Sequence, residues 1–335
     1  MDLLRTLAIL LVILAHTVLS YGAPEHLAPL QFGGTGVDLF FVLSGWLLGG
    51  LLFKELKRNG KVDIKKFWTR RWMRTLPAYF VVLLLSVAQR YMTKENVSFP
   101  WEYFVFLQNY DYPLIFFSIS WSLCVEEQFY LLIAPLLGLL SLAGKKTTTT
   151  SLFLLLILPF FFRSLGWYEH PNETHVRLDG CVMGVFLAHI HHQYPKVWSL
   201  IAKYSIQILI VSISIYLLFF VGRYYPQLGI NDPGKLFLAF IFGTFVIAAN
   251  KNNHWRSKLF LPGSYYIATR SYALYLLHPE ILALLRRFLP DIPFLLYLSL
   301  TLAGSIIISE FLYRAVERPI MNYRENLTIT KDATT

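Results

Sequence analysis

Two side chains that are costly inside a membrane, Arg5 and His16, lie in one apolar stretch of the sequence, Leu3 to Tyr21. They are eleven positions apart. At about 100° per residue, eleven steps return to nearly the same face of a helix after a rise of about 16 Å. One stripe therefore carries a fixed cation at one level and a titratable imidazole at another. Because ionisable groups within a membrane usually face protein or a watery cavity and act there, this stripe predicts a functional site.

A second group of cations, Arg70, Arg71 and Arg74, opens the third apolar segment. Arg71 and Arg74 lie one turn apart on one helix face. Guanidinium groups at this spacing suit phosphate recognition, although the same residues also fit ordinary positive-inside anchors. The local density of cations exceeds what topology requires, and this favours an anionic cytosolic ligand.

An acidic pair, Glu126 and Glu127, lies within the first two turns of another apolar stretch. Ser122 and Tyr130 stand four residues before and after Glu126, so the three side chains share a face. Glu126 is either a site carboxylate or the acceptor of a structural hydrogen bond. Glu127 is expected to reach the membrane interface.

Other polar residues in apolar surroundings have two interpretations each. Asp38, in the first turn of the second segment, either favours the helix dipole or belongs to the site. Ser44, in a small-residue notch with Gly45, is typical of close helix packing. Two outer groups are either satisfied interfacial residues or site residues, with histidine the usual proton carrier near neutral pH: His175, Arg177 and Asp179, and Ser271, Tyr275 and His278.

The composition places the chain outside the soluble globular class. It has 335 residues, 56% of them hydrophobic and 16% aromatic, and a mean hydropathy of +0.50. The net charge of +10 sits in loops between apolar segments, so topology explains it better than nucleic-acid binding does. Cys124 and Cys181 lie in apolar helical patterns and indicate no disulfide framework. The spacing of His189, His191 and His192 is poor for a metal, and none is predicted.

The pattern of apolar segments predicts an all-α polytopic membrane protein with about ten transmembrane helices. Basic residues gather in alternate loops, which the positive-inside rule assigns to the cytoplasm together with both termini. Residues 98–120 are too irregular to assign. We expect one transmembrane domain over residues 1–323 and a short cytoplasmic tail over residues 324–335. The expected segments are 3–21, 37–53, 78–91, 121–142, 151–166, 178–191, 197–222, 235–250, 267–285 and 293–313.

Several motifs in order resemble the acyltransferase 3 family of integral-membrane enzymes, which move acyl groups, often acetyl, from coenzyme A to hydroxyls of sugars, glycans or lipids. Arg5 and His16 are similar to its arginine, ten residues, histidine signature. The later blocks are similar to GVDLFFVLSGWL, RRWMRTLPAY, WSLCVEEQFYLL, THVRLDGCVMG, SYALYLLHPE and the ERP of Glu317 to Pro319. The resemblance covers almost the whole chain.

The resemblance implies roles for particular residues. His16 would be the essential histidine with Arg5 as its partner, Arg71 and Arg74 would lie near the acyl donor, and Glu126 would be the acid of the fourth block. Some relatives carry a fused serine-hydrolase-like extracytoplasmic domain; we recognise none here and expect direct transfer, with an acyl-histidine intermediate as the alternative. The expected acceptor-binding residues are Asp38, Ser44, Tyr130, His175, Arg177, Asp179 and His278.

We therefore expect a multi-pass enzyme of the bacterial cytoplasmic membrane that contacts membrane lipids. The donor is acyl-CoA, a co-substrate and not a tightly bound cofactor, whose phosphates meet Arg70, Arg71 and Arg74. His16 acts as general base on a hydroxyl of a carbohydrate, glycan or lipid acceptor, and Glu126 orients its imidazolium. The competing hypothesis is a proton-coupled secondary transporter through Arg5, His16 and Glu126.

Overall fold

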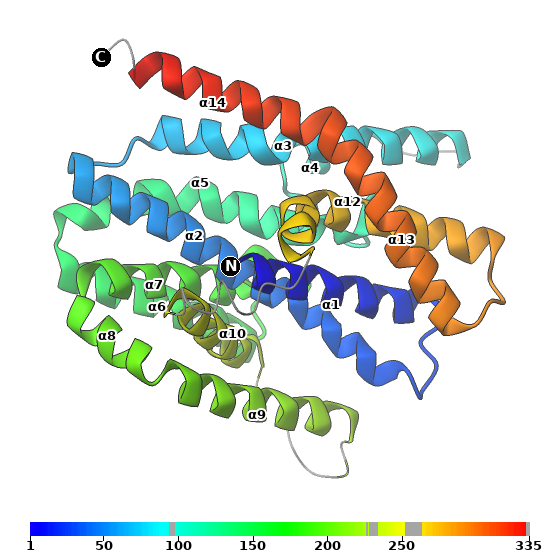
Figure 1. Ribbon diagram of the computed structural model, residues 1–335, viewed down its shortest axis with the longest axis horizontal. Helices are drawn as coiled ribbons and strands as arrows, with labels where there is room; N and C mark the ends of the chain where they lie inside the picture. The colour runs from blue at the N-terminus through cyan, green and yellow to red at the C-terminus, as the bar shows by residue number, and fades with distance from the viewer. Residues whose placement is uncertain (94–97, 226, 228–233, 252–262, 333–335) are drawn as a thin grey trace.

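The computed structural model describes residues 1–93, 98–225, 227, 234–251 and 263–332 (Figure 1). These residues form helices and turns, with no strand among them. The helices are α1 Asp2–Ser20, α2 Gly36–Asn59, α3 Ile64–Thr93, α4 Trp101–Phe104, α5 Trp121–Leu142, α6 Lys145–Ser164, α7 Asp179–Gln193, α8 Pro195–Lys203, α9 Ser205–Tyr224, α10 Gly234–Lys251, α12 Ser264–Phe288, α13 Phe294–Leu312 and α14 Arg318–Asp332. Short 3-10 turns at Ala28–Thr35, Gln108–Tyr110, Ser118–Ser120 and Thr174–Val176, and a π turn at Tyr313–Glu317, connect them.

Seven of the described helices are long and apolar enough to cross a membrane: α1, α2, α3, α5, α6, α9 and α13. This confirms an all-α, multi-pass membrane protein. The other three expected segments coincide with α7, α10 and α12. Helix α7 has only 15 residues, α10 is also short, and α12 carries several charged residues. The number of spans and the side of each terminus stay predictions.

Some boundaries differ from the expected ones. Helix α3 begins at Ile64 and not near Ala78, so the arginine-rich stretch is the first part of a helix. The segment expected over 197–222 is two helices that meet at Tyr204. Helix α14 runs through residue 323, the expected end of the domain, and the guanidinium of Arg324 donates to the carbonyl of Arg70.

The irregular region 98–120 folds as α4 and two 3-10 turns against the outer parts of α3 and α5. The hydroxyl of Tyr79 donates to the carbonyl of Tyr103, and the amide of Gln108 donates to Tyr79 and to Ser120. Gln108 is fully buried. The segment thus makes hydrogen bonds within the protein, as non-helical backbone at membrane depth requires, although the side-chain carbonyl oxygen of Gln108 has no partner among the described residues.

Glycines bring α2 and α7 into backbone contact. A Cβ atom at Gly45 would lie 1.9 Å from the carbonyl oxygen of Cys181, and one at Gly184 would lie 2.2 Å from that of Val42. Neither position has room for a side chain. The notch beside Ser44 is therefore a packing feature of the kind that small residues provide in membrane helices.

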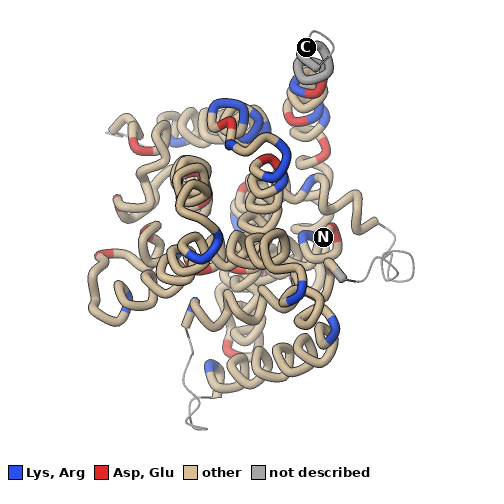
Figure 2. The backbone as a smooth tube through the Cα atoms, turned by 90° about the vertical axis from the view of Figure 1, so that its left-hand side faces the viewer, with Lys and Arg blue, Asp and Glu red and all other residues tan. Residues whose placement is uncertain are grey.

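Basic residues gather at one end of the molecule. The turns between α2 and α3, α5 and α6, and α7 and α8 lie together at the left of Figure 1, and Figure 2 looks onto them. We call this the basic end; its cations include Lys54, Lys57, Arg58, Lys61, Lys66, Lys145, Lys146 and Lys196. Helix α1 lies in the middle of the molecule, packed between α2 and α12. Helix α1 is thus placed where Arg5 and His16 face other parts of the protein.

Candidate active site

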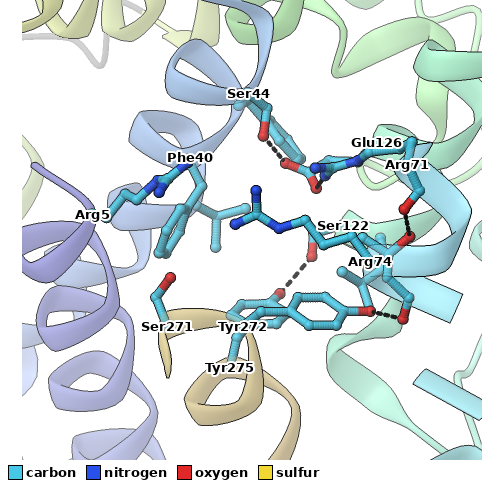
Figure 3. Close-up of a pocket in the computed structure, with 14 residues that line it drawn as sticks. Arg5, Phe40, Ser44, Arg71, Arg74, Ser122, Glu126, Ser271, Tyr272 and Tyr275 are labelled. Carbon is cyan, nitrogen blue, oxygen red and sulfur yellow. Dashed lines mark hydrogen bonds and ion pairs between the residues drawn. The ribbon is translucent and has the colours of Figure 1, made fainter. Parts of the chain in front are cut away.

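A cavity in the middle of the bundle, here the inner chamber, lies between α1, α2, α3, α5 and α12 (Figure 3). Three cations line it, Arg5, Arg71 and Arg74, against one carboxylate, Glu126. The rest of its wall carries hydroxyls and apolar groups: Ser44, Thr75, Ser122, Ser271, Tyr272, Tyr275, Val37, Phe40, Phe41 and Leu123. The chamber therefore has an excess of positive charge in apolar surroundings.

Arg71 is held in place by the protein itself. Its guanidinium donates to the hydroxyl of Tyr130 at 2.7 Å and lies 3.6 Å from the carboxylate of Glu126. The other oxygen of Glu126 accepts a hydrogen bond of 2.5 Å from Ser44. Tyr130, expected to contact the acceptor, is fully buried in this structure and its hydroxyl lies against Arg71. Charge-assisted hydrogen bonds of this kind fix a guanidinium in one geometry.

Arg5 and Arg74 are different. Neither guanidinium has a hydrogen-bond or ion-pair partner among the described residues, and in Figure 3 both point into the chamber. Asp2 and Glu317 attract them only through space, beyond ion-pair distance. A half-buried guanidinium without a partner is costly unless a ligand supplies the counter-charge. The two arginines are thus the residues best placed to bind an anion.

The chamber connects with the basic end. A cavity of about 560 Å³ shares Arg71 and Arg74 with it and continues past Lys54, Arg58, Lys66 and Arg70. A second, of about 420 Å³, shares Arg5 as well. Arg70 is exposed and lines the 560 Å³ cavity together with Arg71 and Arg74, but unlike them it does not line the inner chamber. Basic side chains line the route at each level.

His16 lies beyond the other end of the chamber and does not line it. Tyr275 closes the chamber on that side: its ring is 6.5 Å from that of Phe40 and 5.9 Å from that of His278. The Nδ1 atom of His16 is 2.7 Å from Nε2 of His278, and the two rings meet edge to edge with their planes within 7° of each other and their centroids 5.0 Å apart. One layer of aromatic side chains thus separates the arginines from the imidazole pair.

The expected pairing of Glu126 with His16 is not met. Both oxygens of Glu126 are engaged by Ser44 and Arg71, and the nitrogen of His16 that would meet a carboxylate is bonded to His278. Arg5 is likewise not a direct partner of His16, because it lies in the chamber. His278, expected to contact the acceptor, is fully buried behind His16.

The outer residues form a separate set of ion pairs, here the outer charge cluster: Asp38, Arg163, Arg177, Asp179 and Lys235. The carboxylate of Asp38 accepts from Arg177 at 3.0 Å and from Lys235 at 3.1 Å. That of Asp179 accepts two hydrogen bonds of 2.8 Å from Arg163. Asp38, Arg177 and Asp179 are buried, and their charges form ion pairs within the outer charge cluster and not with residues of the inner chamber.

His175 lies outside both groups. One of its ring nitrogens is 2.7 Å from the carbonyl oxygen of Trp167, and the ring stacks on Tyr110. The structure therefore does not bring it to His16 or to the arginines.

Comparison with known proteins decides the family. Residues 1–314 match the family model described as "Acyltransferase domain". The chain belongs to this acyltransferase family. A protein of Staphylococcus aureus (strain COL), provisionally named an O-acetyltransferase, is 30% identical over 95% of this chain and 56% of its own length. The peptidoglycan O-acetyltransferase OatA of Listeria monocytogenes is 28% identical over 95% of this chain and 55% of its own length. The O-acetyltransferase OatA of S. aureus (strain NCTC 8325) is 27% identical over 96% of this chain and 56% of its own length.

The chain thus spans just over half the length of these relatives. No solved structure matches it. The match confirms the resemblance drawn from the motifs, and it covers the helices that carry Arg5, His16, Arg71, Arg74 and Glu126.

The sequence leaves Ser271 and Tyr275 open between an interfacial and a site role, and it gives no signal for Phe40, Thr75 and Tyr272, which also line the inner chamber. Ser271 and Tyr275 line it, and with His278 they follow one face of α12 at positions i, i+4 and i+7, the same signal that identified Arg5 and His16. Glu127 does not reach the interface: it is buried and accepts a hydrogen bond of 2.9 Å from Thr75. This contact joins α3 to α5 beside the chamber.

Proposed function

We propose that this protein is a membrane O-acyltransferase that moves an acyl group, most simply acetyl, from acyl-CoA to a hydroxyl of a carbohydrate-containing or lipid acceptor. One observation carries the proposal: the inner chamber opens towards the basic end, holds two arginines without a partner among the described residues, and stops one aromatic layer from the His16 imidazole. The names of the relatives, O-acetyltransferase and peptidoglycan O-acetyltransferase, support acetyl as the group and a cell-wall glycan as the class of acceptor.

The donor enters from the basic end. Its phosphates meet Arg74 and Arg5, which have no partner among the described residues, while Arg71, fixed by Tyr130 and Glu126, offers a cation of defined position. The pantetheine arm extends past Phe40 and Tyr275 towards His16. Arg5 and His16 are separated by about 16 Å of helix rise, a distance that an extended arm can cover.

His16 acts as the general base at the thioester. It takes the proton of the acceptor hydroxyl, the hydroxyl oxygen attacks the acyl carbonyl carbon, and the carbon–sulfur bond breaks. The proton then passes from His16 to the thiolate sulfur, so that free coenzyme A and the acyl ester leave and the histidine returns to its starting state. Direct transfer needs no covalent enzyme intermediate.

The membrane orientation follows from charge. The positive-inside rule puts the basic end in the cytoplasm, where acyl-CoA is made, and His16 towards the outer half of α1. We infer a bacterial cytoplasmic membrane with both termini on the cytoplasmic side. Membrane lipids surround the apolar outer faces of the helices.

The test uses purified protein in lipid vesicles with isotope-labelled acetyl-CoA and soluble glycan fragments of the cell wall. The proposal predicts release of free coenzyme A thiol and appearance of the label on acceptor hydroxyls, identified by mass spectrometry. A proton-coupled transporter would leave the thioester intact, and intact acetyl-CoA in the presence of the acceptor would reject the proposal. The separate partners of His16 and Glu126 already speak against a continuous proton path between them.

A further inference from the structure

We propose that His278 is a positioning residue that holds His16 in the tautomer with its proton on Nδ1, which leaves Nε2 as the base. This inference rests on the proposed function for its catalytic meaning, but the tautomer itself is a property of the protein alone. A chain of two hydrogen bonds supports it, from a backbone carbonyl on α12 to the ring of His278 and from there to the ring of His16.

The first link fixes the tautomer of His278. Its Nδ1 atom lies 3.0 Å from the carbonyl oxygen of Leu274, one turn earlier on α12. A carbonyl only accepts hydrogen bonds, so Nδ1 of His278 must carry a proton. Pro279 has no N–H, so the carbonyl of Tyr275 also lacks a helical donor and adds a second acceptor beside this ring. The His278 side chain is fully buried, and water does not compete.

The second link carries this constraint to His16. With its proton on Nδ1, a neutral His278 has a lone pair on Nε2. Nδ1 of His16 is 2.7 Å from that atom and must therefore donate. The remaining nitrogen of His16, Nε2, then has a free lone pair. A carboxylate usually performs this orienting role in histidine-based catalysis. Within the described residues, no Asp or Glu lies within ion-pair distance of either ring.

The arrangement suits a base that must return its proton. When Nε2 of His16 takes the proton of the acceptor hydroxyl, the Nδ1 proton stays hydrogen-bonded to His278, and the neutral neighbour stabilises the imidazolium without trapping it in an ion pair. The proton then leaves from Nε2 to the thiolate of coenzyme A. If the hydrogen bond from Nδ1 of His278 to the carbonyl of Leu274 were lost, the ring of His278 would no longer fix the tautomer of His16. His16 could then carry its proton on Nε2, and this nitrogen could not accept a proton from the acceptor hydroxyl.

The kinetic test compares two variants. For His278→Ala we expect kcat to fall by about 10²- to 10³-fold, with KM for acetyl-CoA within about 3-fold of the original value, because the donor site is untouched. His278→Gln should recover part of this loss, since its side-chain oxygen can accept from Nδ1 of His16. A merely structural role for His278 would predict equal losses in both variants, and unchanged kcat in His278→Ala would overturn the proposal.

A spectroscopic test does not depend on turnover. Nitrogen NMR of protein labelled at histidine, with the His16 signals assigned by their loss in His16→Gln, should show the unaltered protein with the His16 proton on Nδ1. In His278→Gln the same form should persist, and in a folded His278→Ala it should become a mixture. A His16 proton on Nε2 in the unaltered protein would overturn the inference. If the tautomer is as expected but acyl transfer is absent, the proposed function fails instead.

Discussion

The inner chamber and the outer charge cluster contain the same kinds of residue in the same kind of surroundings, yet they differ in how the charges are matched. In the outer charge cluster, Asp38 binds Arg177 and Lys235, and Asp179 binds Arg163. In the chamber, Arg71 is matched but Arg5 and Arg74 have no partner among the described residues. Charges that are satisfied within the protein stabilise its fold, whereas charges left unmatched in a cavity indicate a ligand.

The largest effect on the protein should come from breaking the outer charge cluster. Asp38→Ala leaves the buried Arg177 and the half-buried Lys235 without their carboxylate, and we expect the free energy of unfolding to fall by about 3–5 kcal/mol. Thermal or denaturant unfolding in detergent measures this. The affinity of the folded fraction for coenzyme A should not change. A stable variant with weakened acceptor turnover would instead place Asp38 in the site.

The next effect comes from removing a chamber arginine. Arg74→Ala should raise the dissociation constant for coenzyme A by about 10- to 100-fold, or about 1.4–2.7 kcal/mol, because a charge-assisted contact to phosphate is lost. Stability should be kept or slightly increased, since Arg74 has no ion-pair partner in the part of the chain that the structure describes. Arg74→Lys serves as the matched control and should retain part of the affinity. Loss of stability with unchanged affinity would make Arg74 a structural residue.

A smaller effect of opposite sign is expected at Glu126. Glu126→Gln removes the only carboxylate among the residues that line the chamber and keeps a group able to accept from Ser44. A polyanionic donor should then bind about 3-fold more tightly, as one repulsive charge is gone. Equilibrium titration with coenzyme A measures it. Weaker binding of coenzyme A would show that Glu126 acts mainly by holding the guanidinium of Arg71 in position.

The smallest effect is expected at Arg70, which is exposed at the basic end. Arg70→Ala should change the dissociation constant for coenzyme A by less than about 3-fold at physiological salt, and by more at low salt, because solvent and ions screen an exposed charge. A large effect independent of salt would move the donor phosphates outwards from the chamber.

The sequence predicts the parts of this comparison that depend on local spacing. Apolar length predicts an all-α membrane protein, and the period of a helix places Arg5 and His16 on one stripe of α1, and Arg71 and Arg74 on one face of α3. Nine of the ten expected segments coincide with one helix each, and the segment over 197–222 coincides with two. The predicted start of α3 is less accurate, because the stretch rich in Lys and Arg before Ala78 has the composition of a loop although it forms the first part of the helix.

The partners of charged residues could not be predicted, because they depend on contacts distant in sequence. His278 meets His16 across 262 positions, and Arg177 meets Asp38 across 139. Without those contacts, Glu126 is the natural choice from the sequence as the partner of His16, whereas in the structure its carboxylate contacts Ser44 and Arg71. The sequence likewise gives no sign that Tyr130 is fully buried and accepts a hydrogen bond from Arg71.

The most direct test of the account separates binding from chemistry at His16. His16→Ala, compared with the unaltered protein in vesicles, should bind coenzyme A with a dissociation constant within about 2-fold of the original value, because the inner chamber is intact. Its rate of label transfer from acetyl-CoA to acceptor should fall by at least about 10²-fold, the range that a general base contributes. Transfer at the original rate by the folded variant would contradict the central claim.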